Sequence, residues 1–311
     1  MTYINNKKPT ILVLGGSGML GAHCYDVLKN KYKVITTYCN HSLPYKESVE
    51  FDAIAENSKE KLYYLLNLYQ PDVVINTIAL VTVDGCESNP DLATYMNKIF
   101  VENIVSAMHK TGLNDTHLVQ ISSDSVYGVR KNVKNRLWVE SDDLNPLSVY
   151  ATTKLQGEYE ALKHKGPVSI IRTAFYGINP FSKKSLLWWI INNAKNKQEM
   201  DGWENIYFSP VSANKLVDVI ENMFNESLTG IYNVGSVDSC NKFDFVEAVC
   251  DGINQPVKIN RIITKQNKET LIRPEYSVLS SEKLKGVMTW NTKWHDDLDA
   301  YLNNMLPFPE E

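Results

Sequence analysis

The sequence has few features of a secreted, membrane-bound or metal-centred protein. Its five cysteines are scattered through 311 residues without a Cys-x-x-Cys pair, which argues against a disulfide framework or a zinc site and favours a reducing compartment. The longest apolar run, residues 186–191, is much shorter than the roughly 20 residues that cross a bilayer. The polar first ten residues do not resemble a signal peptide. We therefore expect a cytoplasmic protein with no membrane partner.

Basic charge is also scarce. The chain carries 32 Lys and Arg against 36 Asp and Glu, for a formal net charge of −4, and no basic stripe stands out. This balance argues against nucleic acid as a partner. Hydrophobic residues make up 43% of the chain, enough for a large core in one large domain or two coupled ones. Repeats, low-complexity segments and flexible linkers are absent.

Short apolar runs alternate with helical patterns in the first half of the chain. The apolar runs are 10–16, 33–38, 71–79, 117–123 and 168–173, and the helical patterns are 19–30, 60–69, 92–110 and 148–164. This alternation predicts an α/β fold with a doubly wound parallel sheet. After about residue 175 the pattern loosens into a helix near 184–197, a short strand at 230–235 and a final amphipathic helix.

Glycines recur at every third residue where the first apolar run meets the first helix. Gly15, Gly18 and Gly21 allow a tight turn and let backbone N–H groups approach a pyrophosphate at a helix N-terminus. A plain strand–helix turn is the alternative, but this context favours dinucleotide binding. The intervening Ser17, Met19 and Leu20 are expected to contact the cofactor. Asp52 is a candidate for the adenine side, and equally for a solvated turn.

The end of the second strand indicates which nicotinamide cofactor binds. An acid there would hold the 2′-hydroxyl of NAD, but residues 37–41 contain neither an acid nor an arginine. NADP(H) is therefore favoured and NAD(H) remains possible. Asn40 and His41 are candidate donors to a 2′-phosphate, although His41 is also consistent with an ordinary loop histidine.

The spacing Tyr-x-x-x-Lys can mark a catalytic pair or two surface residues. It occurs at Tyr3/Lys7, Tyr25/Lys29, Tyr127/Lys131, Tyr150/Lys154 and Tyr159/Lys163. Only the Tyr150 pair begins a predicted helix beside the end of the fourth strand, where ligands bind in such sheets. Tyr159 lies about half a turn away on the same helix and faces the opposite side.

Tyr150 and Lys154 have a plausible acid–base role. A free phenol, with a pKa near 10, is a weak acid at neutral pH, and a nearby ammonium would favour its phenolate. Ser123, at the end of the fourth strand, could hold a carbonyl oxygen while Tyr150 donates a proton. Two exposed helix residues and a serine turn are the alternative. The strand, loop and glycine context favours catalysis.

Together these residues resemble the extended short-chain dehydrogenase/reductase family, and more narrowly its dTDP-4-dehydrorhamnose reductase branch, over nearly the whole chain. Segments 15–21, 122–128 and 149–154 are similar to the cofactor loop, the catalytic-serine segment and the catalytic Tyr/Lys of the branch. Further similar segments are 83–97, with Asp84, Glu87 and Asn97, then 171–177 and 273–279.

The resemblance implies reduction of a nucleotide-linked 4-keto-6-deoxysugar by NADPH or NADH. It implies a Rossmann domain, over 1–175 and 205–238, interleaved with a smaller C-terminal substrate-binding domain, over 176–204 and 239–311. The further cofactor residues implied are Ala79, Asn97, Tyr150 and Lys154. The substrate residues implied are Val81, Val83, Ser123, Asp124, Tyr150, Phe175 and Arg273. A homodimer is a possible assembly.

Three departures from the branch bear on the substrate and on metal. Val81 stands where a threonine is frequent, and Phe175 where a tryptophan is frequent, so the particular sugar stays open. No carboxylate cluster matches the magnesium site that the branch places at a subunit contact. We therefore expect no metal.

Two other functions compete with a reductase. Sugar-nucleotide dehydratases carry Asp-Glu after the catalytic hydroxyl residue, and one group of epimerases carries a cysteine two residues after the serine; Ser125 occupies both positions here. Those epimerases also use a histidine after the fifth strand, and residues 176–184 contain none. A non-catalytic NADP-binding regulatory subunit, which also occurs among relatives of the branch, is disfavoured by the intact Ser/Tyr/Lys set.

Overall fold

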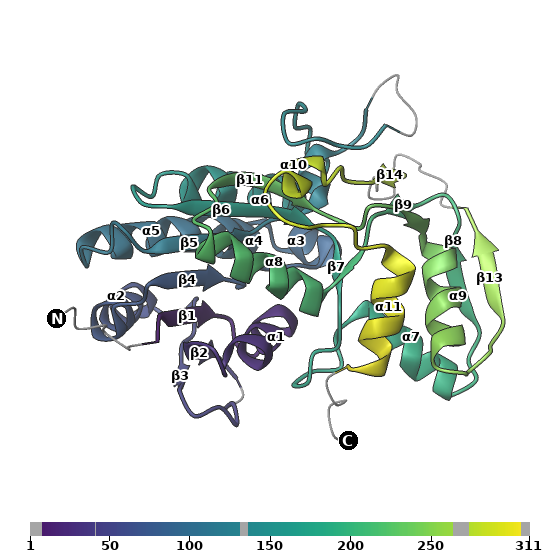
Figure 1. The fold of residues 1–311 in the computed structure, drawn as a ribbon, viewed down its shortest axis with the longest axis horizontal. Coiled ribbons are helices and arrows are strands. Elements are labelled where there is room, and N and C mark those ends of the chain that lie inside the picture. Colours follow the sequence, from purple (N-terminus) through teal and green to yellow (C-terminus); the bar gives the residue numbers. More distant parts are fainter. Residues whose placement is uncertain (1–7, 41, 131–135, 264–273, 306–311) are drawn as a thin grey trace.

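The computed structural model describes residues 8–40, 42–130, 136–263 and 274–305. Its centre is a parallel sheet of seven strands in the order β11-β6-β5-β4-β1-β2-β3 (Figure 1). These strands are β1 (Thr10–Leu14), β2 (Lys33–Tyr38), β3 (Ser48–Glu50), β4 (Val73–Asn76), β5 (His117–Ile121), β6 (Val168–Thr173) and β11 (Gly230–Val234). The strand order reverses between β1 and β4, where a doubly wound sheet opens its ligand crevice.

The central strands are mostly apolar and are buried along their whole length, because helices cover both faces of the sheet. All five residues of β1 and all four of β4 are buried. Leu12 in β1 lies between Ile35 of β2 and Val74 of β4 in the ladder. This register places the ends of β1, β4 and β5 at one edge of the sheet.

Two hydrophobic cores lie on opposite faces of the sheet. One contains residues from α1 (Met19–Leu28), α8 (Ala213–Asn225) and α10 (Glu282–Lys285), and the other contains residues from α2 (Ser58–Tyr69), α5 (Phe100–Lys110) and α6 (Val149–Ala161). Alternate β1 residues point into each core: Val13 into the first and Leu12 into the second. The predicted doubly wound α/β fold is confirmed.

The segment expected to form one helix over 92–110 is interrupted. It consists of α4 (Pro90–Thr94), a π-helical turn η1 (Tyr95–Ile99) and α5. Two further short helices approach the same region, α3 (Val83–Ser88) and the 3₁₀ turn η2 (Asp124–Tyr127). Single π turns inside helices occur frequently at functional sites.

The smaller region lies on the right in Figure 1, and its segments alternate in sequence with segments of the main sheet after β6. It holds two small sheets, of order β12-β9-β14 and β13-β8, and a third pair, β10-β7, joins it to the main sheet. Its elements are β7 (Phe175–Tyr176), α7 (Leu186–Lys195), β8 (Met200–Trp203), β9 (Tyr207–Phe208), β10 (Val211–Ser212), β12 (Cys240–Asn241), α9 (Lys242–Gly252), β13 (Ile259–Ile262), β14 (Tyr276–Ser277) and α11 (Trp294–Asn303). A separate core fills it, with Leu187, Phe245 and Leu298 at its centre.

Two segments lie across the predicted domain division. Strand β9, placed by the prediction with the main sheet, pairs with β12 and β14 of the smaller region. Leu284 and Trp290, placed with the smaller region, pack into a core of the main sheet instead. The Trp290 indole donates a hydrogen bond of 2.9 Å to the Gly235 carbonyl, just beyond β11. The chain therefore passes between the two regions more often than the prediction has it.

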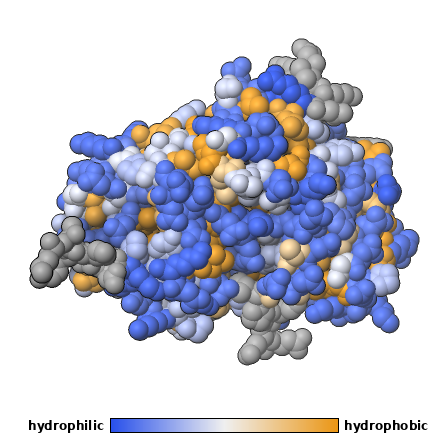
Figure 2. All heavy atoms as spheres, in the orientation of Figure 1, coloured by the Kyte–Doolittle hydropathy of each residue, from blue (hydrophilic) through white to orange (hydrophobic). Residues whose placement is uncertain are grey.

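The surface and the thiols agree with the composition. Figure 2 shows hydrophilic residues over most of the visible face, with hydrophobic residues in small separate groups. All five cysteines are free, as predicted. Across the described ranges, no helix has the length and apolar character needed to cross a membrane.

Candidate active site

The glycine loop lies where β1 ends and α1 begins. Gly15 has a φ of +96°, a conformation that other residues rarely adopt. A Cβ on Gly21 would lie 2.2 Å from the Gly15 carbonyl oxygen, so α1 can approach the loop this closely only with glycine there. Gly18 caps α1, and Met19 and Leu20 form its first turn. No side chain caps this helix end, so its N–H groups are available to an anion.

A cavity of about 240 Å³ adjoins the glycine loop. Its walls are mostly apolar and are formed by Gly15, Ser17, Thr37, Tyr38, Cys39, Phe51, Asp52, Ala53, Ile54, Ile78, Leu80, Leu92 and Met96. Asp52 accepts a hydrogen bond of 3.0 Å from the Ile54 amide. The lining includes the predicted Gly15, Ser17 and Asp52. An apolar slot beside a free helix N-terminus fits an adenosine and its pyrophosphate.

Two other predicted cofactor residues, Asn40 and Ala79, are chain neighbours of residues in the cavity wall. Asn40 is exposed beyond β2, and its side-chain oxygen lies 3.4 Å from the Cys39 thiol. His41 falls outside the described residues. Ala79 is half-buried in the segment that leaves β4, next to Leu80 of the cavity wall.

Asn97 is buried in the π turn and holds the backbone of that segment. Its side chain accepts from the Leu80 amide at 2.8 Å and donates to the Leu80 carbonyl at 3.1 Å. It also donates to the Thr153 hydroxyl of α6 at 3.0 Å. Asn97 therefore links the cofactor cavity to the helix that carries Tyr150. The resemblance implied a cofactor-binding role for Asn97, which stays a prediction. The π turn that presents Asn97 leaves no periodicity signal in the sequence.

Ser123, Tyr150 and Lys154 come together beyond the end of β5. Ser123 caps the turn η2, where its hydroxyl accepts from the Ser125 amide at 3.2 Å and donates to Asp124 at 3.0 Å. Tyr150 lies in the first turn of α6, half-buried and close to Ser123. Lys154, one helical turn later, is buried and donates to the Ile121 carbonyl at 2.5 Å.

Burial dominates the protonation of the pair. It raises the pKa of Tyr150 to about 12, although contact with the Ser123 hydroxyl acts in the opposite direction. Burial lowers the pKa of Lys154 to about 8, while Glu158 partly offsets it. The net direction is opposite to the lowering expected from a nearby ammonium, because burial outweighs the charge effects on the Tyr150 pKa in the free protein. At neutral pH Tyr150 holds its proton and most of the Lys154 population is charged.

A buried ion pair supports this helix from behind. Arg172 of β6 and Glu158 of α6 lie 2.7 Å apart, at 1% residue exposure each. Glu158 also accepts from Ser122 at 2.5 Å, and Arg172 donates to the Tyr127 hydroxyl at 3.0 Å. Removing one partner of such a pair leaves an uncompensated buried charge. This ion pair was not predicted, although the arginine within the apolar run 168–173 was a signal for it.

The competing tyrosines have other environments. Tyr159 is 54% exposed on the outer side of α6. Tyr25 stacks on Tyr45 at 3.7 Å between ring centres. Tyr127 is buried and donates to Asn233 at 2.7 Å. Tyr3 lies outside the described residues. Lys131, four residues after Tyr127, also lies outside the described residues. Of the three pairs that are described in full, only Tyr150/Lys154 adjoins the serine.

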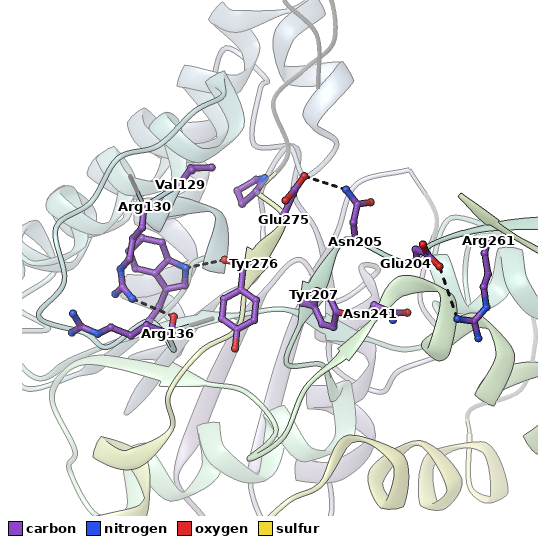
Figure 3. A pocket seen from close by; sticks show the side chains of 13 residues that line it. Val129, Arg130, Arg136, Glu204, Asn205, Tyr207, Asn241, Arg261, Glu275 and Tyr276 are labelled. Atoms are coloured by element: carbon purple, nitrogen blue, oxygen red, sulfur yellow. Dashed lines mark hydrogen bonds and ion pairs between the residues drawn. The ribbon is translucent and has the colours of Figure 1, made fainter. Parts of the chain in front are cut away.

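A larger pocket of about 700 Å³ opens between the segment after η2 and the smaller region (Figure 3). It is lined by Gly128, Val129, Arg130, Arg136, Trp138, Glu204, Asn205, Tyr207, Asn241, Arg261, Pro274, Glu275 and Tyr276. Arg130 and Arg136 both pair with Asp142, and the Arg130 guanidinium lies 3.7 Å from the centre of the Trp138 ring. We name this set the arginine pocket.

None of these lining residues was predicted as a substrate contact, although Gly128 and residues 274–276 fall within segments 122–128 and 273–279, which carry the resemblance. They come from chain segments that only the fold brings together, and no local spacing marks them.

The predicted substrate residues are spread more widely. Asp124 is half-buried beside Ser123, and burial raises the pKa of its carboxyl. Val81 is 63% exposed and Val83 half-buried at the start of α3. Phe175 packs partly against a core of the main sheet. Arg273 falls outside the described residues. Over the described ranges, no cluster of three or more His, Cys, Asp or Glu side chains could hold a metal ion.

Comparison with known proteins agrees with this geometry. Residues 9–306 match the family described as RmlD substrate binding domain. The chain belongs to this family. It is 30% identical to the dTDP-4-dehydrorhamnose reductase of Salmonella typhimurium over 231 residues, which cover 70% of this chain and 73% of that protein. The family is thereby shown, as the resemblance in its motifs predicted.

Two other relatives match over more of their length. The spore coat polysaccharide biosynthesis protein SpsK of Bacillus subtilis is 26% identical, over 94% of this chain and 96% of that protein. The methionine adenosyltransferase 2 subunit beta of Rattus norvegicus is 24% identical, over 91% and 83%. Membership in the family therefore suggests an NAD(P)-dependent oxidoreductase. The individual reaction has to be inferred from the residues of the site, because these relatives have different names and roles.

Solved structures share the fold over nearly the whole chain. A dTDP-4-dehydrorhamnose reductase from Clostridium acetobutylicum superposes with a TM-score of 0.79 at 27% identity, covering 94% of this chain and 98% of that one. A dTDP-4-dehydrorhamnose reductase from Bacillus anthracis in complex with NADP gives 0.81 at 22% identity, covering 96% and 100%. The predicted Rossmann fold with a smaller C-terminal region is confirmed.

Proposed function

We propose that the protein reduces the 4-keto group of a nucleotide-linked 4-keto-6-deoxysugar with NADPH or NADH, and that Tyr150 donates the proton. The observation that carries this is the convergence of Ser123, Tyr150 and Lys154 beyond β5, beside the glycine loop. The dTDP-4-dehydrorhamnose reductases among its relatives support the substrate class.

Each of the three side chains has a role in this reaction. When bound, the reduced nicotinamide supplies the hydride that adds to the carbonyl carbon. The Ser123 hydroxyl holds the carbonyl oxygen, and Tyr150, protonated at neutral pH because burial raises its pKa to about 12, donates the proton to it. The charged Lys154 stabilises the phenolate that remains. Glu158, held by Arg172, keeps a counter-charge behind Lys154.

The cofactor residues favour NADP(H) and accept NAD(H). Gly15, Gly18 and the N-terminus of α1 would hold the pyrophosphate, and the cavity bounded by Asp52 would hold the adenine. Residues 36–40 carry no acid that would repel a 2′-phosphate. Asn40 lies exposed at the same strand end as a donor.

The arginine pocket suits the nucleotide and diphosphate of the substrate. Arg130, Arg136 and Arg261 can bind phosphate oxygens. Tyr207 and Tyr276 lie between Arg261 on one side of the pocket and the other two arginines on the opposite side (Figure 3). The pocket begins at Gly128, five residues after Ser123, so the sugar can reach Tyr150 from it. We further propose a cytoplasmic enzyme that can form a homodimer.

The positions that supply the base in dehydratases and in one group of epimerases carry no Glu, Cys or His in this sequence. Ser125 occupies the position after Asp124, and its hydroxyl donates to that carboxylate at 3.3 Å. A serine hydroxyl is far too weak a base to remove a proton from carbon unless another group activates it. A non-catalytic regulatory role, which the methionine adenosyltransferase subunits among its relatives make the second candidate, would leave the Ser/Tyr/Lys set without use.

The test is turnover of dTDP-4-keto-6-deoxyhexose with NADPH in D₂O, followed by proton NMR. We expect one cofactor oxidised per product and no enzyme-dependent deuterium at C3 or C5. Tyr150→Phe should lose at least about 100-fold in kcat, as for removal of a general acid, while Tyr159→Phe, at an exposed position, serves as the matched control. Equal activity of the two variants, or product without cofactor oxidation, would overturn the proposal.

A further inference from the structure

Glu87 belongs to a segment, 83–97, whose acidic residues have no part in the reaction described above. It lies in α3, half-buried, and its Oε1 accepts a hydrogen bond of 2.8 Å from the backbone N–H of Val149. Val149 is the first residue of α6 and Tyr150 is the second. We propose that Glu87 is a positioning residue that fixes the first turn of α6 and, through it, the Tyr150 hydroxyl. This inference rests on the proposed role of Tyr150.

The first N–H groups of a helix have no acceptor within the helix. In α6 the Ser148 hydroxyl accepts from the Ala151 amide at 3.1 Å, which is a local cap. Glu87 satisfies the amide of Val149 from 62 residues away in sequence. The local cap gives the turn its shape, whereas Glu87 sets where that turn lies relative to the rest of the site. A carboxylate also suits the positive end of the helix dipole.

The segment that carries Glu87 is itself fixed to the cofactor cavity. Leu80, in the cavity wall, is held at both its amide and its carbonyl by Asn97. Cys86, next to Glu87, is fully buried, and its thiol lies 3.5 Å from the same Leu80 carbonyl. A continuous set of contacts therefore runs from the cavity through α3 to the first turn of α6. Glu87 transmits the position of the cofactor site to the proton donor.

The chemistry predicts an order among variants. Glu87→Gln keeps an acceptor oxygen of the same reach, Glu87→Asp keeps the charge but shortens the side chain, and Glu87→Ala removes the acceptor. If position matters, kcat should fall least for Gln, more for Asp and most for Ala, by about 10- to 100-fold in the last. The KM for NADPH should stay within about twofold, since the cofactor contacts are unchanged. Glu102→Ala, an exposed glutamate on α5, is the matched control.

Two readouts separate this inference from the proposed function. Amide hydrogen exchange should show faster exchange in residues 149–151 for Glu87→Ala than for Glu87→Gln, whether or not the protein turns over the chosen sugar. Failure of the wild-type protein to reduce any 4-keto sugar would contradict the proposed function alone. Unchanged exchange in Glu87→Ala, or an activity order in which Asp exceeds Gln, would overturn the positioning role. Should Glu87→Ala fail to fold, the Gln and Asp variants still decide the order.

Discussion

The cofactor site and the arginine pocket are built in different ways. In the proposed cofactor site, the glycine loop offers backbone N–H groups at a helix end. The adjoining cavity is mostly apolar, with walls from the ends of β1, β2, β3 and β4 and from α4 and η1. The arginine pocket is lined mainly by charged and aromatic side chains from separated chain segments. A backbone site requires glycines at a fixed spacing, which a sequence displays directly. A side-chain site requires only that distant residues meet, so its residues can vary without leaving a pattern.

Substitution of Gly21 should have the largest effect on this comparison. A methyl group at 2.2 Å from the Gly15 carbonyl must displace α1 from the loop, and overpacking of this kind costs about 1–3 kcal/mol. We expect Gly21→Ala to weaken NADPH and NADH together by about 10- to 100-fold, measured by fluorescence titration.

The wild-type protein should bind the two cofactors within about 100-fold of each other, because no acid follows β2. A preference for NADH above about 100-fold would contradict the expectation drawn from the missing acid. Unchanged cofactor affinity in Gly21→Ala would contradict a site built from close backbone contacts.

Substitution of Arg130 should affect the other site alone. Its guanidinium is held by Asp142 and stacks on Trp138, so it is oriented for a phosphate. We expect Arg130→Gln to raise the KM of the nucleotide sugar by about 10-fold, with kcat and cofactor affinity nearly unchanged. Steady-state kinetics with each substrate varied in turn would measure this. A loss confined to cofactor binding would show that the pocket does not take the nucleotide.

The smallest effect is expected at the beginning of β5, at the opposite end of the strands from both sites. His117 begins β5, is 4% exposed, and has a pKa lowered to about 4, mainly by burial and then by His164. Below pH 6.5 the unfolded chain takes up a proton at this residue that the folded protein does not, so stability falls with pH until about pH 4. Between pH 7 and 5.5 this amounts to about 1 kcal/mol.

His117→Gln, which can keep the hydrogen bond to Ser169, should flatten that part of the pH dependence in urea unfolding. Cofactor affinity at pH 7 should not change. If the slope between pH 7 and 5.5 is the same in both proteins, His117 is not a source of it.

The sequence predicted those parts of the molecule whose physics is local. The parallel sheet follows from apolar runs, the loop from glycines, and Tyr150/Lys154 from spacing beside a strand end. The π turn around Asn97 was not predicted, because its stabilising bonds go to Leu80 and Thr153 in other segments. The Glu158–Arg172 ion pair was not predicted for the same reason. The pairing of these two buried charges can be inferred only when β6 and α6 are known to be in contact.

The crossing of the chain between the two regions limits how the molecule can be divided. Strand β9 belongs by its pairing to the smaller region, yet the chain then returns to the main sheet for α8 and β11, and again for Leu284 and Trp290. No single cut therefore separates a cofactor half from a substrate half. Exchange of substrate specificity with a relative by recombination would have to transfer the segments around β8–β9 and β12–β14 together, leaving 281–290 with the recipient. A library with one crossover point would disrupt a core in nearly every member.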